Sequence, residues 1–157
     1  MEFKRVIVLH KCISVIRAES RKAWGIETGG PLVGYRTKDA ELVVSGACGP
    51  GPNSKMERYT VIIDGVHAQK FCDQMLQDSD GLIDYVGDWH KHPGFSLKPS
   101  GQDALAMKTM ADFEYSPTKY PISLIYRALP EAFHVYVWDG SGSLIRIPSK
   151  MSKTHQY

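Results

Sequence analysis

The alternation of hydrophobic and polar positions predicts short strands that alternate with helices. Apolar runs bounded by Gly, Pro or Asp are typical of buried strands, and they occur at residues 5–9, 29–36, 41–47, 59–64, 82–92, 121–126, 133–138 and 144–148. Apolar residues recur at helical spacing within residues 11–24, 65–78 and 100–114. This order of elements predicts an α/β domain in which about three helices flank a mixed sheet.

Length and composition fit one soluble domain. A chain of 157 residues with 43% hydrophobic and 23% charged residues can bury a core without disulfides. We expect residues 1–150 to form the domain and residues 151–157 a flexible tail. The apolar run near the N-terminus is too short for a signal peptide, and no stretch approaches the ~20 apolar residues of a membrane span. The cytoplasm is the predicted location, with no membrane partner.

Charge and cysteine usage narrow the class further. The net charge is +2 without a long basic run, which gives no reason to expect a nucleic-acid partner. The three cysteines, Cys12, Cys48 and Cys72, show no C-x-x-C spacing and are expected to be small buried groups in a reducing compartment. No histidine with an Asn or Asp is tied to any of them, which disfavours a cysteine nucleophile.

The stretch D-W-H-K-H-P-G-F-S-L-K-P-S-G-Q-D at residues 88–103 carries the candidate chemistry. On a strand, His90 and His92 point to one face, and Trp89 and Lys91 point to the other. Two imidazoles on one face can reach a single zinc ion at about 2.0–2.1 Å. An isolated H-x-H pair is more often a surface or hydrogen-bonded pair, so the assignment depends on what lies near it.

Asp103 would complete the ligand set if the loop 93–99 folds back over the histidines. His90, His92 and Asp103 then leave one position of a tetrahedral ion open to water, which is typical of a catalytic zinc site. The pattern Ser100-x-x-Asp103 is also a helix capping box, and the two interpretations are compatible, because a capped helix end holds a ligand rigidly.

A water activated by zinc needs a general base, and Glu27 in I-E-T-G-G-P-L-V-G is the candidate. The glycine pair after it allows close approach of the backbone to other elements. The alternative is an exposed glutamate at a helix end.

Several other residues carry weaker expectations. Asp88 shares the strand parity of His90 and could accept a hydrogen bond from a ligand imidazole, or face solvent as a strand-end acid. Trp89 could line a substrate groove, although Trp24, Trp89 and Trp138 are all expected in the core. His67 and His134 lack ligand spacing and are interpreted as structural.

The two motifs together resemble a known family. E-T-G-G-P-L-V-G (27–34) and H-K-H-P-G-F-S-L-K-P-S-G-Q-D (90–103) are similar to the JAMM, or MPN-plus, zinc metallopeptidases, whose pattern is a glutamate, H-x-H-P, six residues and S-x-x-D. The resemblance implies a single MPN (JAB, deaminase-like) domain with a curved mixed sheet. It also implies zinc on His90, His92 and Asp103, a proton-transfer role for Glu27, and a hydrogen bond from Ser100 to the oxyanion.

The same resemblance implies a substrate. Such enzymes hydrolyse the isopeptide or peptide bond after the C-terminal glycine of a ubiquitin-like protein, and small members resemble peptidases encoded in antiphage operons beside activating and conjugating enzymes. One alternative is release of an amino acid from a sulfur-carrier protein in cysteine synthesis. The other is a metal-free MPN scaffold that binds partners without cleaving them. The oligomeric state and any activating partner stay open.

Overall fold

The computed structural model describes residues 2–154, and its centre is an eight-stranded mixed sheet. The strands lie in the order β10-β1-β3-β2-β6-β7-β8-β9. Their bounds are β1 Arg5–Leu9, β2 Thr28–Arg36, β3 Glu41–Ala47, β6 Asp84–Lys91, β7 Ile122–Ala128, β8 Glu131–Trp138, β9 Leu144–Ile147 and β10 Ser149–Ser152. β6 lies between β2, which runs antiparallel to it, and β7, which runs parallel. The predicted α/β class with a mixed sheet is confirmed.

The sheet curls until its two edges meet. β9 ends at Ile147 at one edge and β10 begins at Ser149 at the other, so that only Pro148 joins them. An open sheet of this many strands would be about 34 Å wide at ~4.8 Å per strand, a width that one residue cannot span. The carbonyl of Pro148 accepts a hydrogen bond from the Val6 N–H at 2.9 Å, which ties the join to β1.

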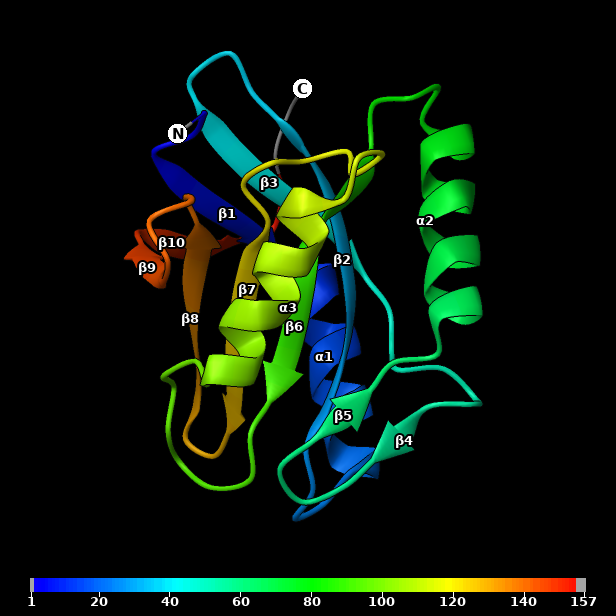
Figure 1. Cartoon of the computed structure of the whole chain (residues 1–157), viewed down its shortest axis with the longest axis vertical. Coiled ribbons are helices and arrows are strands. Elements are labelled where there is room, and N and C mark those ends of the chain that lie inside the picture. Colours follow the sequence, from blue (N-terminus) through cyan, green and yellow to red (C-terminus); the bar gives the residue numbers. More distant parts are fainter. Residues whose placement is uncertain (1, 155–157) are drawn as a thin grey trace.

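Three helices pack on this sheet: α1 His10–Lys22, α2 Gly65–Asp78 and α3 Gly101–Asp112. In the view of Figure 1, α3 lies in front of the sheet and α1 behind it. The side of α1 that carries Cys12, Ile13 and Ile16 is buried in the main core with residues of β1, β3 and β6. Met107 and Ala111 of α3 form a smaller cluster with Trp138 of β8. Among the described residues, no helix is long and apolar enough to cross a membrane.

Three local expectations differ from the structure. The strand expected at 59–64 shrinks to a separate hairpin of β4 Lys55–Met56 and β5 Val61–Ile62. Trp24 is 88% exposed, so its assignment to the core is wrong: α1 ends at Lys22 and the chain turns outward, whereas Trp89 and Trp138 are buried.

The first two residues of the expected flexible tail lie in a strand. Met151 and Ser152 belong to β10 and pair with Val8 and Leu9 of β1. Backbone pairing at a sheet edge needs no hydrophobic pattern, so the sequence carries no sign of this strand. Residues 155–157 of the expected tail lie outside the described residues.

Candidate metal centre

The end of β6 places the histidine pair as its sequence spacing predicts. His90 lies opposite Gly29 of β2 and is 6% exposed, and His92 follows directly after the strand and is half-buried. Trp89 points to the opposite face, where its indole Nε1 donates to the carbonyl of Cys48 at 2.8 Å. Lys91 shares that opposite face, and its ammonium reaches the end of α1.

A glycine makes room for the His90 ring. A Cβ atom on Gly29 would lie 2.4 Å from the carbonyl oxygen of Trp89 and 2.6 Å from Cδ2 of His90. Both distances are far below contact distance, so a residue with a side chain could not occupy this position while the ring and the strand stay in place. The expectation that the glycine pair permits close approach is therefore met at Gly29.

Asp103 reaches both histidines because the start of α3 folds back over β6. The side chain of Ser100 accepts from the Asp103 N–H at 3.2 Å, and the Ser100 N–H donates to Asp103 Oδ2 at 2.6 Å. This capping box orients the buried carboxylate. Oδ1 of Asp103 lies 3.2 Å from Nδ1 of His90, and Oδ2 lies 3.0 Å from Nε2 of His92.

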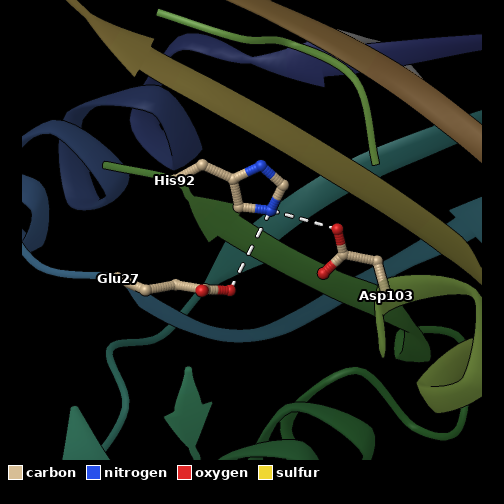
Figure 2. A group of neighbouring side chains, drawn as sticks. All are labelled: Glu27, His92 and Asp103. Carbon is tan, nitrogen blue, oxygen red and sulfur yellow. Dashed lines mark ion pairs between the residues drawn. The ribbon is translucent and has the colours of Figure 1, made fainter. Parts of the chain in front are cut away.

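Glu27 approaches from the other side, as Figure 2 shows. Its Oε1 lies 3.9 Å from Nε2 of His92, the same ring nitrogen that faces Asp103. Glu27 is 7% exposed, so the alternative of an exposed helix-end glutamate is wrong. Its backbone N–H donates to the carbonyl of Glu57 at 2.8 Å, which attaches it to the β4–β5 hairpin.

Among the described residues, Glu27, His92 and Asp103 offer ligand atoms that all lie within 4.8 Å of one another, a cluster that could hold one metal ion, and His90 meets this cluster through Asp103. In the described part of the chain, His90 Nδ1 and His92 Nε2 are buried and make no hydrogen bond. Such buried nitrogens cost free energy unless a bound group, such as a metal ion, uses their lone pairs. Two ligand atoms at ~2.05 Å from one tetrahedral ion are about 3.3 Å apart. The distances from Asp103 to His90 Nδ1 and to His92 Nε2, 3.2 and 3.0 Å, are close to this value. The donors are imidazole nitrogens and carboxylate oxygens.

The electrostatics favour the metal-binding protonation state at His90 and Asp103, but not at His92. Burial lowers the pKa of His90, which keeps this imidazole neutral, whereas the neighbouring Asp103 carboxylate raises the pKa of His92. Burial by itself would raise the pKa of Asp103, but His92, His90 and the Ser100 N–H together lower it. Burial raises the pKa of Glu27, with Asp103 adding to this effect and His92 opposing it. Asp103 is thus ready to bind as an anion, and Glu27 accepts a proton more readily than an ordinary glutamate.

The remaining candidates lie in different surroundings. Ser100 is exposed at the N-terminus of α3, where its hydroxyl oxygen caps the helix. Asp88 receives a hydrogen bond from the Tyr85 hydroxyl at 3.3 Å and lines a cavity of about 540 Å³ between α2 and α3. Burial raises the pKa of Asp88 to about 7. Asp88 is half-buried, so the alternative of a strand-end acid that faces solvent is wrong.

Sequence reasoning missed two contacts. Nothing in the spacing of Lys91 and residues 20–23 indicates that its ammonium meets the end of α1. Cys48 Sγ lies 3.2 Å from Nε2 of His67, a pair that the sequence gives no reason to expect. Burial raises the pKa of the Cys48 thiol, so the thiol is not an activated nucleophile.

Fold and cluster together define an α/β domain with a candidate metal centre at the end of β6. The chain belongs to the family described as prokaryotic homologs of the JAB domain, which matches residues 9–140. The predicted JAMM-type family is thereby confirmed. A solution structure of a protein from Desulfitobacterium hafniense has the same fold, with a TM-score of 0.67 over 97% of this chain and 99% of the other at 14% identity.

Curated relatives carry peptidase names. A protein from Escherichia coli (strain TW11681) called CD-NTase/cGAS isopeptidase is 36% identical over 74 residues, which are 47% of each chain. One of the same name from Enterobacter hormaechei is 31% identical over 68% of this chain and 58% of the relative. A "Probable metalloprotease" from Sinorhizobium fredii is 27% identical over 81% of this chain and 80% of the relative. The match thus spans about half the length of the first of these relatives. Their names and the family agree with a peptidase of the JAMM type that uses a metal.

Proposed function

We propose that the protein is a zinc-dependent isopeptidase or peptidase that hydrolyses the bond after the C-terminal glycine of a ubiquitin-like protein. The observation that carries the proposal is the meeting of His90 Nδ1 and His92 Nε2 with the two oxygens of one buried carboxylate, with Glu27 beside them. His90, His92 and Asp103 would hold the zinc ion. Glu27, at 3.9 Å from His92, is left to act on the water at the open position.

The chain's own groups suit amide hydrolysis. Zinc bound here would lower the pKa of a water from about 15.7 to near 7 and polarise the scissile carbonyl. Glu27 takes a proton from the attacking water and delivers it to the leaving amine, a role worth typically ~10²–10⁴-fold in rate. The Ser100 hydroxyl, whose oxygen already accepts from Asp103 N–H, donates a hydrogen bond to the developing oxyanion, and a comparable donor is worth about 3–4 kcal/mol.

The substrate proposal rests on the surroundings of Glu27. The β4–β5 hairpin, held to Glu27 by the Glu27–Glu57 hydrogen bond, is a two-stranded sheet in the described residues. An extended C-terminal tail could add a strand to it and so bring its last carbonyl to the metal. The relatives named CD-NTase/cGAS isopeptidase support a conjugate as substrate. An antiphage setting beside activating and conjugating enzymes is part of the proposal.

The test is hydrolysis of linear fusions whose first half is a ubiquitin-like carrier ending in Gly-Gly. Zinc-loaded protein should release the carrier after the last glycine. Chelator-treated protein and Glu27→Ala should not, and a bulky residue in place of that glycine should abolish cleavage. Cleavage restricted to a sulfur carrier with a C-terminal amino acid would favour the alternative substrate. Purified protein that binds no zinc and cleaves nothing would indicate a scaffold.

A further inference from the structure

Lys91 is a buried cation that the proposed reaction does not use. It lies between the two histidines in sequence, but its side chain points to the opposite face of β6 and is 7% exposed. Its Nζ donates to the carbonyl of Ala23 and, at 3.4 Å, to that of Ser20. These are carbonyls at the C-terminus of α1, where backbone acceptors lack helical partners and the partial charge is negative.

The carbonyl of Ala23 links Lys91 to the general base. Besides Lys91, it accepts from the N–H of Ile26 at 3.4 Å, and Ile26 directly precedes Glu27. On the other side of Glu27, Thr28 is the partner of Lys91 in the β2–β6 ladder. Glu27 therefore lies between two residues that Lys91 contacts. The Lys91 side chain binds the Ala23 carbonyl, and the Lys91 backbone pairs with Thr28.

From this geometry we propose that Lys91 is a positioning residue that holds the turn 23–27 so that Glu27 stays at its place beside His92. The inference rests on the proposed function of Glu27. The two faces of β6 then have different roles. His90 on one face contacts Asp103, and Lys91 on the other face holds the turn that positions Glu27. The misplacement of a reacting group by ~1 Å can lower the rate about 10²-fold, so a mobile turn at residues 23–27 would lower kcat.

The experiment compares Lys91→Met with a matched control. Lys119 donates to the carbonyls of Ala111 and Phe113 at the end of α3, both at 3.1 Å, so Lys119→Met removes the same kind of helix-end contact away from Glu27. Hydrogen exchange of the segment 23–28 is measured first, because it needs no activity. We expect Ile26 N–H to exchange about ten-fold faster in Lys91→Met and at the wild-type rate in Lys119→Met.

Kinetics on the carrier fusion supply the second measurement. Lys91→Met should bind zinc as the wild type does and keep its KM, while kcat falls about 10–100-fold. Added to Glu27→Ala, it should lower any residual kcat by less than about two-fold, because both changes remove the same contribution. If Lys91→Met does not fold, Lys91→Gln, whose amide is one atom shorter, replaces it.

Three results would overturn the proposal: unchanged exchange at Ile26, faster exchange without loss of kcat, or losses that multiply in the double variant. A wild-type protein that cleaves no fusion would instead refute the proposed function. In that case the exchange measurement still decides whether Lys91 holds the turn.

Discussion

The substitution Gly29→Ala tests whether the His90 ring lies against the backbone of β2. The new methyl group would begin 2.4 Å from the Trp89 carbonyl oxygen, and ordinary contact starts near 3.4 Å, so β2 and β6 must separate by about 1 Å. Gly29 does not have a positive φ, so the effect is one of space rather than of backbone strain. Forced overpacking of this kind costs typically 1–3 kcal/mol of stability.

The same substitution should also weaken zinc binding, because it displaces the His90 ring. The methyl group would also lie 2.6 Å from Cδ2 of His90, so the ring has to shift relative to Asp103. We expect zinc affinity, measured by competition with a chromogenic chelator, to fall about 10–100-fold, and thermal denaturation to show the loss of stability. Gly65→Ala is the matched control, because a Cβ there meets nothing within 4 Å. If Gly29→Ala behaves like Gly65→Ala in both assays, the ring does not lie where we place it.

Three further predictions concern roles and pH. By metal analysis, Glu27→Ala should keep zinc and His90→Ala should lose it. The kcat of Glu27→Ala should fall about 10²–10⁴-fold, and a fully active variant would refute the role of Glu27 as general base. Ser100→Ala should bind zinc and lower kcat about 10²–10³-fold, and an unchanged kcat would exclude the oxyanion role. The hydrogen bond from Arg17 lowers the pKa of Glu131 to about 2, so this pair stabilises the fold above about pH 4.5 and loses that effect as pH falls towards 2. In acid titrations followed by circular dichroism, Glu131→Gln should remove a small part of that dependence, because both side chains are about one-third exposed.

Local chemistry explains most of what the sequence predicted. The shared face of His90 and His92 follows from strand alternation alone. The cap formed by Ser100 and Asp103 follows from helix-end hydrogen bonding, and the structure contains it. The helix at 65–78 follows from its apolar period, and α2 has those bounds. Each of these depends on residues within a few positions of one another.

Tertiary packing decided the rest. No local pattern says that Glu27 meets His92, that Lys91 holds the end of α1, or that the sheet curls until β10 pairs with β1. Trp24 failed as a core residue for the same reason, since its exposure depends on where α1 ends against the sheet. The sequence determined which groups could bind and activate, because side-chain type and short-range periodicity are local. Whether these groups come together depended on contacts between segments far apart in the chain. Such contacts form only in the complete fold, so no local pattern reports them.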